Sequence, residues 1–131
     1  MTQNRCQKFQ QTVSDCLVRH RSILDVMSKL QESSAHVNRA IAKAVTTCGC
    51  LKIEARKQPV PSDAALAEIS QYTQTHLEGK LCPSCFEVVE KEVGNVLFYV
   101  TAMCELLNLD LEKVIASEND RISTLGLYSL T

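Results

Sequence analysis

Residues 86–107 read FEVVEKEVGNVLFYVTAMCELL, and this stretch decides the fold class. Its apolar side chains recur every three or four residues, at Phe86, Val89, Val93, Val96, Val100, Met103 and Leu107. That spacing matches the 3.6-residue turn of an α-helix, whereas the side chains of a half-buried strand alternate every two residues. Ser84 and Glu87 have the spacing of a capping box, so we expect this helix to begin at that box.

The same spacing predicts three other main helices. We expect the first at residues 2–31 and the last from Asn108 or Asp110 to about residue 123. The helix between them carries a seam of small and apolar side chains: Val37, Ile41, Ala44, Cys48, Leu51 and Ala55. Four long helices joined by short links favour an antiparallel helical bundle, so the expected fold is all-α.

The longest interruption lies in the middle of the chain. Pro59 and Pro61 end the second helix, because proline lacks a backbone donor and disfavours helix in the residue before it. A short inserted helix of about residues 64–77 follows, and Gly79 ends it. We expect one domain, residues 1–131, with an insertion at about residues 58–81.

Composition narrows the function classes. The net charge is −1 and the pI is about 6.3, so the chain has no overall positive charge that would attract nucleic acid or an anionic membrane. We expect neither as a partner. Residues 1–12 are polar rather than apolar, so we expect a cytoplasmic protein whose seven cysteines stay reduced. Apolar stripes on the second and third helices favour a homodimer or a higher homo-oligomer.

Two segments resemble a known family. Residues 92–99, EVGNVLFY, and residues 107–114, LNLDLEKV, resemble the second half of the MazG-type all-α nucleotide pyrophosphohydrolases. The resemblance implies a MazG-like fold, a nucleotide ligand and a Mg²⁺ site that combines Glu-x-x-Asp on one helix with Glu-Glu-x-x-Glu on another. The corresponding positions here are Thr46, Thr47, Cys50, Glu92 and Asn95.

Only Glu92 keeps a carboxylate among those positions, and Glu54 lies one turn beyond Cys50. Because Mg²⁺ prefers carboxylate oxygens and water, we expect a MazG-like protein that is non-catalytic or repurposed. The alternative is an active Mg²⁺-dependent nucleoside triphosphate pyrophosphohydrolase with an altered site. That site would draw on Glu92, Asn95 and Glu54, or on Glu87 and Glu90.

The cysteines form a second pattern, with Cys48-Gly-Cys50 and Cys82-Pro-Ser-Cys85 as two close pairs. Four thiolates suit a tetrahedral Zn²⁺ or an iron centre. In a continuous helix Cys48 and Cys50 would point about 200° apart, so a shared metal requires a break at Gly49 or a ligand from another subunit. Three interpretations stay open: a four-cysteine zinc site, a thiol redox or metal-sensing use of Cys82 and Cys85, and plain structural thiols.

Overall fold

The computed structural model describes residues 3–19 and 21–126, and its framework is four α-helices. These are α1 (Arg5–Cys16), α2 (Ile23–Lys43), α3 (Pro83–Leu106) and α4 (Leu111–Leu125). A π-helix, η1 (Ala44–Cys48), continues α2. The segment before α3 holds two short strands, β1 (Leu51–Ile53) and β2 (Leu77–Gly79), with a 3₁₀-helix, η2 (Leu66–Gln71), between them.

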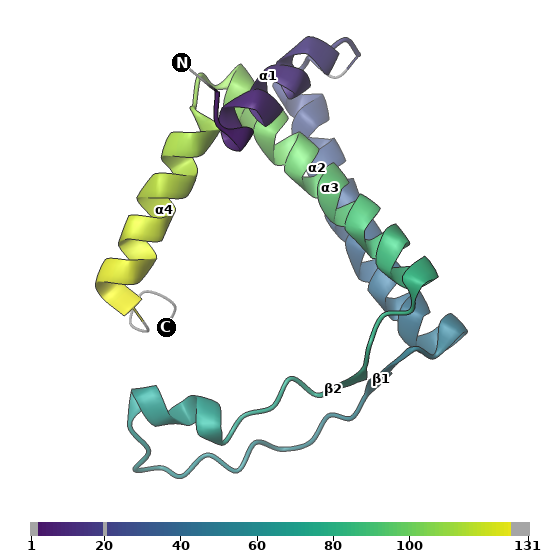
Figure 1. The fold of residues 1–131 in the computed structure, drawn as a ribbon, viewed down its shortest axis with the longest axis vertical. Helices are drawn as coiled ribbons and strands as arrows, with labels where there is room; N and C mark the ends of the chain where they lie inside the picture. Colours follow the sequence, from purple (N-terminus) through teal and green to yellow (C-terminus); the bar gives the residue numbers. More distant parts are fainter. Residues whose placement is uncertain (1–2, 20, 127–131) are drawn as a thin grey trace.

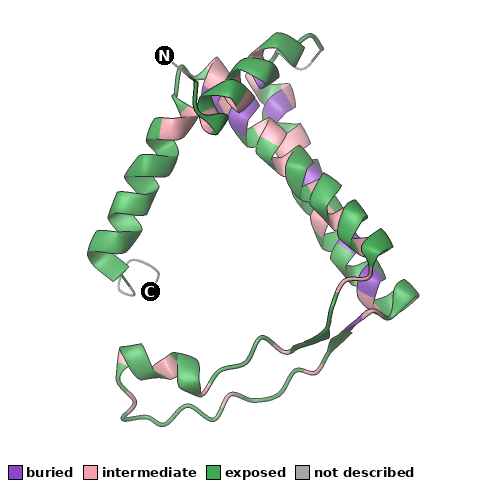
Figure 2. Ribbon diagram, in the orientation of Figure 1, coloured by how far each residue is buried: buried purple, intermediate pink, exposed green. Residues whose placement is uncertain are grey.

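Helices α2 and α3 form a long antiparallel pair, and α1 lies across one end of it (Figure 1). The core is centred at that crossing, where Val13 and Leu17 of the α1 region meet Val26 of α2 and Ala102 of α3. Buried residues are concentrated there and become sparse along the rest of the pair (Figure 2). No described helix is long and apolar enough to cross a membrane.

Helix α4 diverges from the α2–α3 pair and packs against α1 near its own first turn (Figure 1). The Asp110 carboxylate caps α4 by accepting from the backbone N–H groups of Glu112 and Lys113, as the sequence predicts. Residues 113–126 are exposed. The all-helical class is confirmed apart from a two-stranded sheet, but the four helices do not close into one bundle within a single chain.

The first two helices have boundaries that differ from the prediction. Residues 2–31 were expected to be one helix, but α1 ends at Cys16 and α2 starts at Ile23. Apolar spacing continues through this break, so periodicity could not reveal it. The break lets α1 turn back and bury Val13 and Leu17 against α3, and this tertiary packing prevails over local helix propensity.

The predicted insertion is an antiparallel hairpin that projects from the helical pair (Figure 1). Leu51 pairs with Gly79, Lys52 with Glu78 and Ile53 with Leu77. The second helix therefore ends at Cys48 instead of at the prolines, and the expected helix of residues 64–77 is reduced to η2. The C-terminal residues 127–131 lie outside the described part of the chain.

Candidate metal centre

Four cysteine side chains meet where the hairpin joins the helices. The Sγ atoms of Cys48, Cys50, Cys82 and Cys85 all lie within 4.8 Å of one another. Cys48 ends η1, Cys50 precedes β1, and the other two belong to the first turn of α3. The structure thus brings together all four cysteines that the two sequence pairs single out.

A break at Gly49 makes this meeting geometrically feasible. The final turn of α2 widens into the π-helix, where the Gly49 N–H donates to the Ala44 carbonyl at 2.9 Å. Gly49 then adopts a left-handed conformation with φ of 82°, which glycine reaches without a Cβ penalty. Cys48 and Cys50 consequently no longer lie on opposite sides of one helix, and the break that a shared site requires is present.

The hairpin register supplies the second half of the site. Gly79 has φ of 85°, and a Cβ added there would lie 2.5 Å from the carbonyl oxygen of Cys50. Only glycine lets the two backbones approach this closely. Because Cys82 follows Gly79 by three residues, that approach delivers the start of α3 to the Cys50 side of the hairpin.

Cys82 is also the N-cap of α3, where the sequence had predicted a box formed by Ser84 and Glu87. The Cys85 N–H donates to Cys82 Sγ at 3.4 Å, and Pro83 fills the first helical position. Proline suits that position because its missing N–H would have had no helical partner. The helix therefore begins two residues earlier than predicted and places the Cys82 and Cys85 sulfurs on one side of its first turn.

The thiols of this cluster differ in pKa. Hydrogen bonding from the Cys85 backbone, followed by that from its thiol, lowers the pKa of Cys82 to about 7. The hydrogen bond with Cys82 raises the pKa of Cys85 to about 12, and the same partner raises the pKa of Cys48. In the metal-free protein the first negative charge therefore resides on Cys82.

The separation of the sulfurs can be compared with that of a four-thiolate metal site. A tetrahedron with Zn–S bonds of about 2.3 Å places its sulfur atoms about 3.8 Å apart. Cys48 Sγ lies 3.7 Å from Cys82 Sγ, and no pair of ligand sulfurs exceeds 4.8 Å. One pair of sulfurs therefore has the tetrahedral separation and every other pair lies within about 1 Å of it, so small side-chain rotations would place all four around one ion. Their softness favours Zn²⁺ or a single iron over Mg²⁺.

The carboxylates of the predicted Mg²⁺ site are not gathered in this way. Glu54 lies just after β1 and pairs with Lys52 at 2.8 Å, whereas Glu92 lies on α3. Asn95, Glu87 and Glu90 are exposed. In the part of the chain that the structure describes, the four cysteines are the one group of three or more histidine, cysteine or acidic side chains close enough to share a metal.

Glu92 does line a shallow cleft of about 220 Å³ between α2 and α3. His36 Nδ1 lies 3.8 Å from its carboxylate, and Arg39 and Lys43 line the same cleft. One carboxylate oxygen of Glu92 is buried without a hydrogen-bond partner. Sequence reasoning missed the three α2 residues, although their spacing of three and four places them on one side of a helix.

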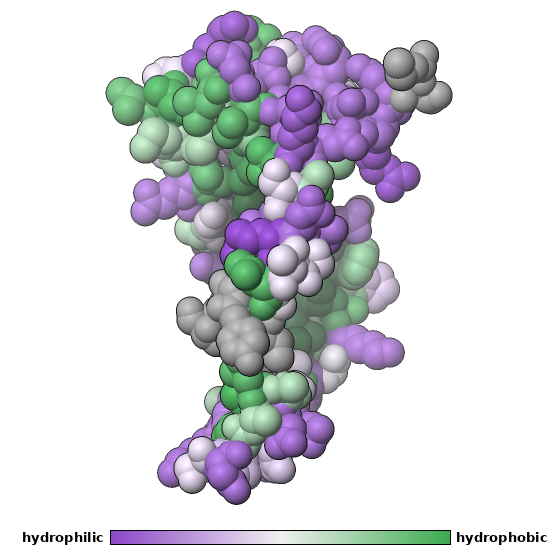
Figure 3. All heavy atoms as spheres, turned by 90° about the vertical axis from the view of Figure 1, so that its left-hand side faces the viewer, coloured by the Kyte–Doolittle hydropathy of each residue, from purple (hydrophilic) through white to green (hydrophobic). Residues whose placement is uncertain are grey.

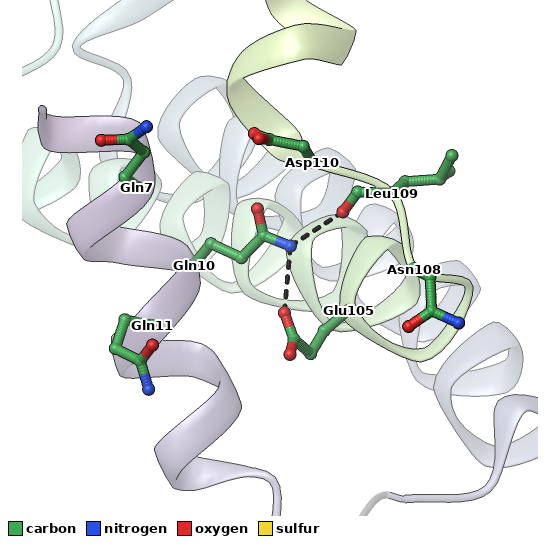
Figure 4. Close-up of a pocket in the computed structure, with 7 residues that line it drawn as sticks. All are labelled: Gln7, Gln10, Gln11, Glu105, Asn108, Leu109 and Asp110. Carbon is green, nitrogen blue, oxygen red and sulfur yellow. Dashed lines mark hydrogen bonds between the residues drawn. The ribbon is translucent and has the colours of Figure 1, made fainter. Parts of the chain in front are cut away.

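A larger hollow, of about 340 Å³, lies where α1 meets the α3–α4 turn (Figure 4). Its central side chain is Gln10, whose amide nitrogen donates to Glu105 Oε2 at 3.0 Å and to the Leu109 carbonyl at 2.8 Å. The amide oxygen of Gln10 accepts from the Leu111 N–H at 2.8 Å. Because these groups form hydrogen bonds with one another, we interpret the hollow as a contact that connects α1 to the α3–α4 turn.

The remaining cysteines lie outside the cluster. Cys104 is buried, and burial raises its pKa. Cys16 is exposed and Cys6 is half-buried.

Searches of family models, curated proteins and solved structures find no match for this chain.

Proposed function

We propose that Cys48, Cys50, Cys82 and Cys85 bind one Zn²⁺ ion that has a structural role. The observation that carries this proposal is the meeting of four sulfurs within 4.8 Å. Structural zinc sites have four protein ligands, whereas catalytic sites keep a position open for water or substrate. Four thiolates around one ion leave no such position.

The ion would fasten the hairpin to the helices. The β1–β2 ladder has three residues in each strand, and an isolated ladder of that size is marginal in water. Cys48 and Cys50 precede the first strand of the hairpin, and Cys82 and Cys85 follow its second strand. A shared metal therefore closes the base of the hairpin, and its binding free energy contributes to folding.

The experiment is a metal analysis of protein purified under reducing conditions. We expect about one zinc per chain, and removal by a chelator should lower the melting temperature. Protein that carries no metal and gains no stability from added Zn²⁺ would refute the proposal. Iron at the same stoichiometry would replace zinc while leaving the four-cysteine site in place.

We also propose that the chain is a non-catalytic or repurposed MazG-like protein. The antiparallel α2–α3 pair and the position of Glu92 in its cleft support this proposal. The absence of a shared carboxylate site among the described residues favours loss of catalysis, since Mg²⁺ must be held to activate water. Arg39 and Lys43 carry charges that suit phosphate, so a nucleotide is the ligand class to test at this cleft.

This second proposal is tested with Mg²⁺ and a panel of nucleoside triphosphates. We expect no pyrophosphate release above the background of a Glu92→Gln variant. Turnover by the wild-type chain that Glu92→Gln abolishes would establish the alternative, an active pyrophosphohydrolase.

A thiol redox module is the other candidate function for the cysteine cluster. It is favoured by one observation: Cys82, whose pKa is lowered to about 7, lies 3.7 Å from the sulfur of Cys48. A peroxide would oxidise these two thiols to a disulfide and be reduced to water. Mass spectrometry of peroxide-treated protein distinguishes the roles, because a reversible Cys48–Cys82 disulfide supports redox use and unchanged zinc-loaded protein supports the structural site.

A further inference from the structure

The chain buries too few apolar side chains for its length. Among the described residues, eight hydrophobic residues are buried, whereas eighteen large hydrophobic residues are exposed. The accessible surface is 10,019 Å², and a compact monomer of this mass would expose about 6,900 Å². The projecting hairpin accounts for part of the difference, but most of the exposed hydrophobic residues belong to the helices.

The two faces of the α2–α3 pair differ in character. One face carries the cleft lined by His36, Arg39, Lys43 and Glu92. The other carries a groove of about 280 Å³ lined by Ser34, Val37, Asn38, Val93 and Val96. The first face is therefore charged, and the second is lined by valines and small polar groups.

Further exposed hydrophobic residues extend the second face. Leu97 and Val100 follow Val93 by four and seven residues, and Phe86 precedes it by seven, so all four side chains lie along one stripe of α3. Ile41 follows Val37 by four residues and extends the α2 side of the groove. We call this surface the apolar face, defined by Ile41, Phe86, Val93, Leu97 and Val100.

Among the described residues, helix α4 adds a second stripe of exposed hydrophobic side chains. Val114, Ile115, Ile122 and Leu125 are exposed at helical spacing, and α4 stands apart from the α2–α3 pair (Figure 1). Seen from the side of α4, hydrophobic patches lie at the surface beside and behind this helix (Figure 3). The described part of one chain thus leaves both surfaces exposed.

We propose that a second copy of this chain covers the apolar face and forms a homodimer. A stable dimer of the obligate kind hides about 2,000–5,000 Å² in total, or roughly 1,000–2,500 Å² per chain. The chain as a whole, hairpin included, exposes about 3,100 Å² more than a compact monomer, and a contact that hid a third of this excess would reach the lower end of that range. A straight apolar stripe can pack against its own copy around a two-fold axis, and a net charge of −1 gives little repulsion between copies.

The test is the mass of the protein in solution at about 10 μM. We expect twice the 14.6 kDa of the chain for the wild type and a twofold fall in mass for Leu97→Glu. Leu97 is 53% exposed, so glutamate fits the folded chain but places a charge inside the interface. Helical circular dichroism and zinc content show that the variant is folded.

The matched pair of Val93→Glu and Val88→Glu tests the choice of face. Both valines lie on α3 and are similarly exposed, at 42% and 51%, but Val88 lines the opposite cleft with Lys43. We expect Val93→Glu to be monomeric and Val88→Glu to be dimeric. A monomeric wild type, a dimer that survives both Leu97→Glu and Val93→Glu, or a dimer lost only in Val88→Glu would overturn the proposal.

A measurement without substitutions provides a further check. The melting temperature of a dimer that dissociates on unfolding rises with protein concentration, whereas that of a monomer does not. We expect a rise over a hundredfold range of wild-type concentration. A constant melting temperature, together with a monomeric mass, would rule out the second copy.

Discussion

Gly79 lies where the backbones of the hairpin approach each other beside the four-cysteine cluster. Alanine there would place its Cβ 2.5 Å from the Cys50 carbonyl oxygen, at a φ of 85° that residues with a side chain rarely adopt. The left-handed conformation alone costs about 1–2 kcal/mol. We expect Gly79→Ala to lower the free energy of unfolding by at least that amount and to weaken zinc binding, because Cys50 must move.

Gly94→Ala is the matched control for this substitution. Gly94 lies inside α3, and an added Cβ would meet no atom within 4 Å. Alanine in a helix interior is favoured over glycine by about 0.5–1 kcal/mol, so we expect higher stability and unchanged zinc affinity. Denaturant unfolding and competition with a zinc indicator measure both quantities. Equal behaviour of the two variants would show that the close approach at Gly79 has no role.

Cys82→Ser distinguishes the proposed metal-binding role of Cys82 from its role as the N-cap of α3. Serine is a good N-cap, so this variant keeps a side-chain acceptor at the start of α3 while it removes the soft sulfur of the proposed zinc ligand. We expect loss of bound zinc and the same fall in melting temperature that a chelator causes. Cys16→Ser alters an exposed cysteine outside the cluster and should retain the metal. Full zinc occupancy in Cys82→Ser would remove Cys82 from the ligand set.

The sequence singles out the four cysteines that meet in the structure, but it does not predict the geometry of their meeting. The two close cysteine pairs stand out as sequence spacings, and Gly49 marks the required break. The π-helix that precedes Gly49 has no such signal, because its residues continue the apolar seam of α2. The Glu92 cleft depends on which residues of α2 face α3, and that register is set by packing between helices that are far apart in the sequence.

At the level of helices, Gln10 joins α1 to the turn between α3 and α4 (Figure 4). Its amide makes three hydrogen bonds, to Glu105, to the Leu109 carbonyl and from the Leu111 N–H. Each such bond contributes about 0.5–1.5 kcal/mol net, and truncation removes all three. We expect Gln10→Ala to lower the free energy of unfolding by about 1.5–4.5 kcal/mol and to leave zinc content unchanged.

Gln11→Ala is the control for that prediction. Gln11 belongs to the same helix, but its amide donates only within α1, to Asp15 four residues later. Surface substitutions of this kind usually change stability by less than about 0.5 kcal/mol. Urea unfolding of the two variants is the measurement. If Gln10→Ala is as stable as Gln11→Ala, the joint does not hold α1 in place.

The helices also show which boundaries a sequence can reveal. Asp110 marks the start of α4 because a capping aspartate has a local chemical role, and the structure confirms it. The end of α1 has no comparable signal, since the chain turns there to place Leu17 in the core. The start of α3 was predicted two residues late because Cys82 takes the capping position from Ser84.

At the scale of the whole molecule, the hairpin and the helical pair differ in the contacts that stabilise them. The α1–α3 crossing has a buried core of Val13, Leu17, Val26 and Ala102. The hairpin has one buried residue among its strands, Leu51, and its 3₁₀-helix η2 has at most isolated contacts with other described elements. Regions with few buried apolar contacts open at a low free-energy cost. We therefore expect the cysteine cluster to be the main restraint on the hairpin base.

Metal removal should consequently act on the hairpin before it acts on the helices. In the structure the Glu54 N–H donates to the His76 carbonyl at 3.0 Å, just beyond the β1–β2 ladder. Without the metal we expect hydrogen exchange of this amide and of the strand amides to rise at least about tenfold, because a ladder this short is marginal alone. Core amides around Val26 and Ala102 should keep their protection, since their packing does not involve the cysteines.

Peptide-level exchange with and without a chelator measures the difference between hairpin and core. A uniform rise over hairpin and core would mean that the metal stabilises one cooperative unit, and unchanged exchange in the hairpin would mean that its own contacts suffice.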